Sequence, residues 1–172
     1  EVEELCRRLH VEYRVVPSNI AKIVFDIRKE NNPCSLCAKL RRGMLNDAAK
    51  SFGCNKVALG HHFDDAVQTF MLNLFAPVTY LDRSDITVIR PLVYAQEKDI
   101  KYFALHADLP VVESSCPANK HTEREEMKQL LLGLEKDNRG LRHRIFGAMQ
   151  RAGVDGFRES RLKHYSDDDG EE

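Results

Sequence analysis

The sequence lacks three features that would assign it to other classes of protein. It has no run of about 18 apolar residues, so we expect no transmembrane helix. Its first ten residues, EVEELCRRLH, are acidic and amphipathic and lack the basic-then-apolar order of a signal peptide. None of its nine glycines is adjacent to another, which excludes any loop that needs two successive glycines.

What is present is typical of a soluble globular protein. The 172 residues are 42% hydrophobic and 31% charged, which argues against wholesale disorder and suits a single domain. An odd number of cysteines, five, argues against a disulfide framework and favours a cytoplasmic protein. Cys34 and Cys37 form a C-x2-C pair, which in such a protein indicates metal or redox chemistry.

Hydrophobic periodicity predicts strands that alternate with helices, the pattern of a parallel α/β sheet. The expected helices cover residues 1–9, 19–30, 34–51, 63–75, 98–108, 121–136 and 139–151. The expected strands cover residues 12–16, 56–59, 87–89 and 111–112. We divide the chain into an α/β part, 1–120, a helical segment, 121–155, and a disordered tail, 156–172.

The cysteines form the first candidate site. Both sulfurs of the C-x2-C pair fall in the first turn of a predicted helix, where unpaired N–H groups and the helix dipole favour thiolates. Cys116 follows a predicted strand, at the edge where open α/β sheets bind ligands. Three cysteines can hold a [4Fe–4S] cluster, or a zinc ion completed by a histidine, and spacing alone leaves both open.

The second candidate is LGHHFDD, residues 59–65, where a strand ends, a glycine permits a turn and a helix begins. Asp64 and Asp65 could hold a hard cation such as Mg²⁺ bound to a nucleotide. The alternative is that the two aspartates only cap the helix. The third candidate is the basic segment 139–164, which suits nucleic acid or, alternatively, a solvated helix face.

Four motifs, in order, resemble one known family. They are CSLCAKLRRGML, VALGHHFDDAVQTFMLNLF, IRPLVYAQEKDI and a late cysteine, and they extend over roughly residues 1–150. The chain resembles the tRNA 2-thiocytidine synthetases of the TtcA type, within the PP-loop ATP pyrophosphatase superfamily. The resemblance implies an α/β, adenine-nucleotide alpha-hydrolase-like domain that lacks its first strands and ends in helices.

The resemblance also implies a reaction and its residues. ATP and Mg²⁺ would adenylate the C2 oxygen of a cytidine in the tRNA anticodon loop, and sulfur would then displace AMP. Cys34, Cys37 and Cys116 match the ligands of a [4Fe–4S] cluster. The remaining assignments are Asp64, Asp65 and Arg41 for catalysis, Gly60, His61 and Asp64 for the nucleotide, and Arg42, Arg142, Arg144 and Arg151 for RNA.

The chain departs from the family in one motif. Relatives bind the ATP phosphates with an SGGxDS loop. That loop contains two adjacent glycines, and no two glycines are adjacent in this sequence. We therefore expect an incomplete nucleotide site, and no thiolation by this polypeptide alone. The expected partners are tRNA, a sulfur donor (a cysteine desulfurase or sulfide) and a second copy in a homodimer, with no membrane. The alternatives are a uridine 2-thiolation enzyme and a non-catalytic, zinc-stabilised RNA-binding module.

Overall fold

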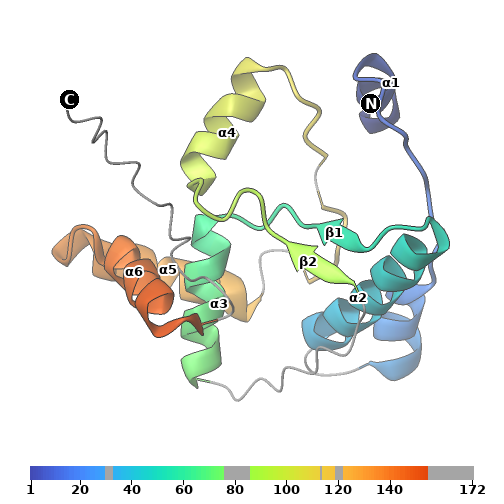
Figure 1. The fold of residues 1–172 in the computed structure, drawn as a ribbon. Helices are drawn as coiled ribbons and strands as arrows, with labels where there is room; N and C mark the ends of the chain where they lie inside the picture. Colours follow the sequence, from blue (N-terminus) through green and yellow to red (C-terminus); the bar gives the residue numbers. More distant parts are fainter. Residues whose placement is uncertain (30–32, 76–85, 113, 119–121, 155–172) are drawn as a thin grey trace, which may run out of the picture.

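The computed structural model describes residues 1–29, 33–75, 86–112, 114–118 and 122–154 (Figure 1). Its elements, in chain order, are α1 (Val2–Arg8), the π-helix η1 (Lys22–Arg28), α2 (Pro33–Ser51), β1 (Lys56–Ala58), α3 (Phe63–Phe75), β2 (Thr87–Ile89), α4 (Glu97–His106), α5 (Glu123–Asp137) and α6 (Leu141–Ala152). Within this part of the chain, no helix is both long and apolar enough to cross a bilayer.

The two strands form a parallel pair, as the alternation of strands and helices predicted. Val57 is the register partner of Val88, and Lys56 and Ala58 pair with Thr87 and Ile89. The ladder continues into the turn after β1, where the Leu59 N–H donates to the Ile89 carbonyl at 2.9 Å. Both strands therefore deliver their carboxyl ends to the same edge, the start of α3 and the loop before α4.

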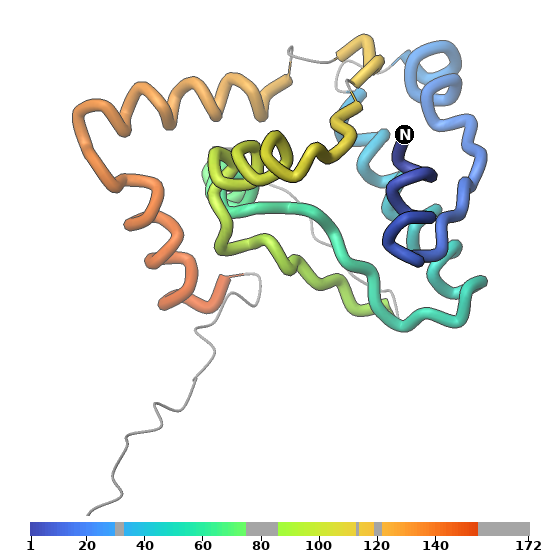
Figure 2. The backbone as a smooth tube through the Cα atoms, turned by 90° about the horizontal axis from the view of Figure 1, so that it is seen from above, coloured from blue at the N-terminus to red at the C-terminus, as the bar shows by residue number. Residues whose placement is uncertain are grey.

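The core lies between α3, α5 and α6, away from the N-terminal helices (Figure 2). Helix α3 contributes Phe63, Ala66 and Val67, which pack on residues of the α5–α6 hairpin. Their partners in that hairpin are Met127, Leu131, Phe146 and Met149. The Phe63 and Phe146 rings lie 5.0 Å apart between centroids, in a tilted arrangement that aromatic pairs favour. This packing holds the α5–α6 hairpin against α3, whose first turn contains Asp64 and Asp65.

Three local predictions are wrong. Residues 12–16 and 111–112 form no strand, and Val15, Val111 and Val112 are exposed. β-branched residues make a strand only when a neighbouring strand shares their hydrogen bonds, and among the described residues neither segment has one. Residues 12–16 instead run past the end of α2, where the Arg14 guanidinium lies 4.3 Å from the centroid of the Phe52 ring. The helix predicted over residues 19–30 is largely a π-helix, η1, followed by Lys29 in the left-handed region.

The other helices match their predicted positions within a few residues, and Gly53, with a φ of +70°, follows α2 as expected for a glycine C-cap. The predicted tail, residues 156–172, lies outside the described residues. Helix α4 differs from the core helices because it buries none of its residues. Tyr102, Phe103 and Leu105 on this helix are all more than 60% exposed.

The core predicts a clear contrast between two adjacent leucines of α5. Leu131 is 2% exposed and Leu130 is 46% exposed. Leu131→Ala should lower the free energy of unfolding by about 2–5 kcal/mol, because it leaves a cavity between α3 and the hairpin. Leu130→Ala, the matched control, should cost less than about 1 kcal/mol. Urea denaturation followed by circular dichroism measures both, and equal losses would contradict the assigned core.

Candidate functional site

The GHHFDD turn begins where β1 ends and continues into α3. His62 and Asp65 hold it together through a reciprocal pair of hydrogen bonds. The His62 N–H donates to Asp65 Oδ2 at 3.1 Å, and the Asp65 N–H donates to His62 Nδ1 at 3.3 Å. This is the geometry of a capping box, with histidine and aspartate in place of the usual serine and glutamate. A capping role, one of the two alternatives for the aspartates, therefore holds for Asp65.

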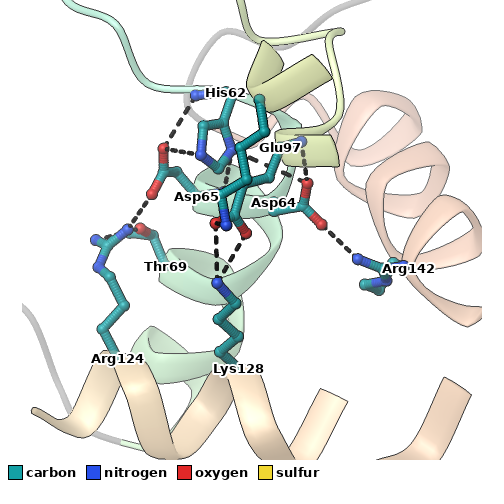
Figure 3. A network of polar contacts seen from close by, with 9 residues as sticks. His62, Asp64, Asp65, Thr69, Glu97, Arg124, Lys128 and Arg142 are labelled. Atoms are coloured by element: carbon teal, nitrogen blue, oxygen red, sulfur yellow. Dashed lines mark hydrogen bonds and ion pairs between the residues drawn. The ribbon is translucent and has the colours of Figure 1, made fainter. Parts of the chain in front are cut away.

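Asp64 is the most buried charged group of the site. Only 4% of the residue is exposed, and both carboxylate oxygens have partners (Figure 3). Oδ2 accepts the Glu97 N–H at 2.8 Å, and Oδ1 accepts Arg142 Nη1 at 2.5 Å. Because Glu97 starts α4 and Arg142 lies in the first turn of α6, this one carboxylate joins three helices.

Arg142 is itself positioned by Glu135, near the end of α5. The Glu135 carboxylate accepts the backbone N–H groups of Gly140 and Arg142, at 2.7 and 3.0 Å, and so caps the start of α6. Arg142 Nε lies 3.6 Å from the same carboxylate. Burial raises the pKa of Glu135, but these hydrogen bonds and the Arg142 charge outweigh it, so the pKa is lowered.

Asp65 lies nearer to solvent and is bound from α5. Arg124 Nη1 donates to Asp65 Oδ1 at 2.8 Å, and its second terminal nitrogen donates to Thr69 Oγ1 at 3.0 Å. The side chains of Asp65 and Arg124 are 21% and 43% exposed. A cation or ligand could therefore bind Asp65 with a smaller free-energy penalty than Asp64, whose oxygens are buried and already hydrogen-bonded.

Glu97 forms the third link between the helices. Its carboxylate lies 2.8 Å from Lys101 Nζ and 2.8 Å from Lys128 Nζ. Burial by itself would raise the pKa of Glu97, but the two lysine hydrogen bonds outweigh it and lower the pKa to about 2. The same contact raises the pKa of Lys128. Together, Asp64, Asp65 and Glu97 attach the α5–α6 hairpin to the turn through Arg142, Arg124 and Lys128 (Figure 3).

His61, by contrast, is exposed at the turn beside Gly60. Burial lowers its pKa most; Asp65 acts in the opposite direction, and the positive charges of Arg90 and Arg124 lower it further. The imidazole is therefore neutral at pH 7 and can accept a hydrogen bond. The influence of Arg90 shows that the motif after β2 lies near the turn after β1.

Two of the candidate cysteines, Cys34 and Cys37, lie near the start of α2, and Cys116 lies in the segment before α5. Cys34 and Cys116 are exposed and Cys37 is half-buried. The pKa of Cys34 is raised first by burial and then by the negative charges of Cys116 and Cys37. Cys116 therefore lies close enough to Cys34 to act on its ionisation, although the two are distant in sequence.

No metal site is formed among the described side chains: no three histidine, cysteine or acidic groups converge on one point. The donor set nevertheless suits a soft metal centre, since three thiols with mutually repelling charges gain from a shared cation.

The predicted RNA-binding arginines have different surroundings. Arg142 is committed to Asp64, and Arg144 donates to the Arg139 carbonyl at 2.9 Å. Arg151 is exposed in the last turn of α6, and Arg41 and Arg42 are exposed on α2. Sequence reasoning missed Arg124, Lys128, Glu97 and Thr69. No local signal marks them, because each acquires its partner only when helices distant in sequence pack together.

Comparison with known proteins identifies relatives for this arrangement, although no family model matches the chain. The tRNA-cytidine(32) 2-sulfurtransferase of Geobacter sulfurreducens is 43% identical over 137 residues, covering 72% of this chain and 53% of the relative. The enzyme of the same name from Citrifermentans bemidjiense is 40% identical over 148 residues, covering 80% of this chain and 58% of the relative. The chain therefore spans about half the length of the curated relatives it matches.

Among solved structures, the U34-tRNA thiolase NcsA from Methanococcus maripaludis, solved with its [4Fe-4S] cluster, matches with a TM-score of 0.73. It is 26% identical, and the match covers 88% of this chain and 55% of that one. Fold and sequence together define the class as the PP-loop tRNA thiolases. Within that class, the chain belongs to the family of the tRNA-cytidine 2-sulfurtransferases, as its motifs predicted.

The buried carboxylate gives a first prediction for the site. Asp64→Asn should lower the free energy of unfolding by about 2–4 kcal/mol, because Arg142 loses its shorter ion pair in a largely buried position and keeps only the longer contact with Glu135. Asp47→Asn, on the exposed side of α2, makes the same chemical change and should cost less than about 0.5 kcal/mol. Chemical denaturation of the two variants compares them, and a small loss for Asp64→Asn would show that the bridge contributes little.

Glu97 gives a prediction about pH. Its folded-state pKa, about 2, is below its ordinary value of 4.5, so its stabilising contribution is present above about pH 4.5 and declines as the pH falls toward 2. Glu97→Gln should therefore cost about 1–2 kcal/mol at pH 7, and much less at pH 3. Urea titrations at both pH values test this, and a loss that does not change with pH would exclude the assigned ion pairs.

Proposed function

We propose that this protein acts in the ATP-dependent conversion of cytidine to 2-thiocytidine in the tRNA anticodon loop. One observation carries the proposal. The C-x2-C pair, Cys34 and Cys37, lies at the start of α2 in a chain that is 43% identical to a tRNA-cytidine(32) 2-sulfurtransferase. The likeness to a thiolase solved with its [4Fe-4S] cluster supports the same interpretation.

Cys34, Cys37 and Cys116 would hold the [4Fe–4S] cluster in this proposal. A cluster with three cysteine ligands leaves one iron without a protein thiolate, which supplies a position for the sulfur to be transferred. The location of Cys34 and Cys37 near the start of α2 suits this role, because a bound iron centre would supply the positive charge that offsets the repulsion between the thiolates. The exposure of Cys34 and Cys116 leaves the site open to a substrate.

The nucleotide and the reacting base would lie at the GHHFDD turn. Of its two aspartates, Asp65 is the better candidate for a Mg²⁺ ligand or a catalytic group, since it is more exposed and its partner Arg124 is itself partly exposed. Asp64 would serve by positioning α3, α4 and α6. Gly60 and the neutral His61 would contact the nucleotide, and Arg41 would offset negative charge on phosphate groups.

The partners follow from this activity. The substrate would be tRNA, contacted by Arg42, Arg144 and Arg151, and the sulfur would come from a cysteine desulfurase or from sulfide. The reaction would take place in the cytoplasm, and two copies could act as a homodimer. A uridine substrate is the second candidate, because the matching solved structure is a U34-tRNA thiolase. The higher identity to the cytidine enzymes, 43% against 26%, favours cytidine.

The cysteine assignment predicts which thiols the cofactor requires. After anaerobic reconstitution the chain should bind about four iron and four sulfide ions, and Cys34→Ser or Cys116→Ser should abolish most of this binding. Cys54→Ser, which also replaces an exposed thiol, should bind the full complement. Metal and sulfide analysis with visible absorption measures the cofactor. One zinc ion per chain and no sulfide would instead support the zinc-stabilised module.

The choice of base is tested in cells. Disrupting the gene should remove 2-thiocytidine from bulk tRNA, as measured by nucleoside mass spectrometry, and the wild-type gene should restore it. A gene that encodes Cys34→Ser should not restore it, whereas Cys54→Ser should. Loss of 2-thiouridine with normal 2-thiocytidine would overturn the cytidine assignment in favour of uridine.

A further inference from the structure

A cleft of about 270 Å³ lies beside the paired aspartates and is not used by any role assigned above. Its walls come from α3, the first turns of α4 and α6, and the middle of α5. The cations that line it are Lys98, Lys101, Lys128 and Arg142, and the carboxylates are Asp64 and Glu97. Leu131 and Leu132 form an apolar side.

The groups that line the cleft are four cations and two carboxylates, so positive charge is in excess there. Asp64 pairs with Arg142, which also lies 3.6 Å from Glu135. Glu97, the second carboxylate, lies 2.8 Å from both Lys101 and Lys128, so two ammonium groups share one negative charge. Each ammonium has three N–H donors, so donors remain for a ligand. Lys98 is exposed and forms no hydrogen bond or ion pair with any described residue.

Glu97 also prepares the cleft for an anion. By binding both lysines it holds their ammonium groups on one side of the cleft, which reduces the entropy that a ligand would have to remove. The start of α4 contributes the positive end of a helix dipole at the same place, since Gln96, Glu97 and Lys98 all line the cleft. The side chain of Lys101 is 71% exposed, so a ligand can reach it from solvent.

The neighbouring cleft indicates which anion would enter. A second cleft of about 260 Å³, lined by His62, Asp65 and Arg124, shares Gln68, Glu97 and Lys128 with the first. If the target base of the tRNA lies at Asp65, the adjoining RNA backbone would therefore pass Lys128, which lines both clefts. Lysines contact backbone phosphates as point charges and do not read sequence, which suits a surface that only orients the RNA.

We propose that the cleft formed by Lys98, Lys101 and Lys128 binds a backbone phosphate of the RNA, next to the nucleotide held at Asp65. The inference rests on the proposed function and adds a contact that the sequence did not indicate. The predicted basic segment 139–164 supplies only Arg142 to this cleft, and Arg142 is already paired with Asp64. The other cations of the cleft come from α4, which supplies Lys98 and Lys101, and from α5, which supplies Lys128.

The test removes two of the lysines without touching the paired aspartates. Lys98→Gln with Lys101→Gln is compared with Lys56→Gln together with Lys136→Gln, two exposed lysines outside the cleft, so that both proteins lose the same charge. Binding of the full chain to an anticodon stem–loop RNA is measured by fluorescence anisotropy between about 50 and 200 mM salt. Urea denaturation checks that each variant is folded.

The cleft variant should bind RNA about tenfold less tightly at 100 mM salt, and the slope of log affinity against log salt should be shallower by about 1–2. The control variant should retain the wild-type slope. Equal slopes in the two variants, or no RNA binding by the wild-type chain, would overturn the proposal. If the cleft variant loses affinity for inorganic triphosphate but binds RNA normally, the cleft binds nucleotide phosphate and the RNA assignment is wrong.

These outcomes are separate from a failure of the proposed function. Cluster content depends on Cys34, Cys37 and Cys116, and the lysine substitutions should leave the iron and sulfide stoichiometry unchanged. A chain that binds zinc but shows the predicted loss of salt dependence would disprove the sulfurtransferase proposal and support the phosphate site. A chain that holds a full cluster, but whose salt slope is unchanged by the lysine substitutions, would support the sulfurtransferase proposal and disprove the phosphate site.

Discussion

The ion pair between Asp64 and Arg142 is the contact on which the arrangement of the site depends. A carboxylate with 4% exposure is stable as an anion only when its oxygens are hydrogen-bonded and its charge is matched. Arg142 and the Glu97 N–H meet both conditions, and they come from two helices that follow α3 in sequence. The requirement to satisfy one buried group thus links α4 and α6 to the turn after β1.

The two adjacent aspartates have different structural roles, which one residue could not combine. Asp64 is buried and joins three helices, while Asp65 caps α3 and lines the second cleft, beside Arg124. Their different partners follow from helix geometry, since consecutive residues of a helix point about 100° apart. Around them, apolar packing of α3 on the α5–α6 hairpin brings the charged side chains within bonding distance. The apolar core and the polar network therefore stabilise the same interface.

Sequence-based prediction succeeded where the signal for an element is local, and it was wrong where an element needs a partner distant in sequence. Helices α2, α3, α5 and α6 were predicted closely because apolar periodicity and capping residues mark them locally. The strands predicted at 12–16 and 111–112 do not form, because a strand depends on a neighbour that local composition does not encode. The resemblance of four motifs identified the family, but it could not assign different tasks to Asp64 and Asp65.

The sequence by itself determined the class of fold, the C-x2-C pair at a helix start, the histidine–aspartate turn and the family. These features lie within short segments, so the order of the residues is enough to reveal them. Only the tertiary structure decided that Arg124, Lys128 and Arg142 bind the three carboxylates, and that Lys98 and Lys101 line a cleft. Each of these depends on the distance between helices far apart in sequence, which is set by how their apolar faces pack.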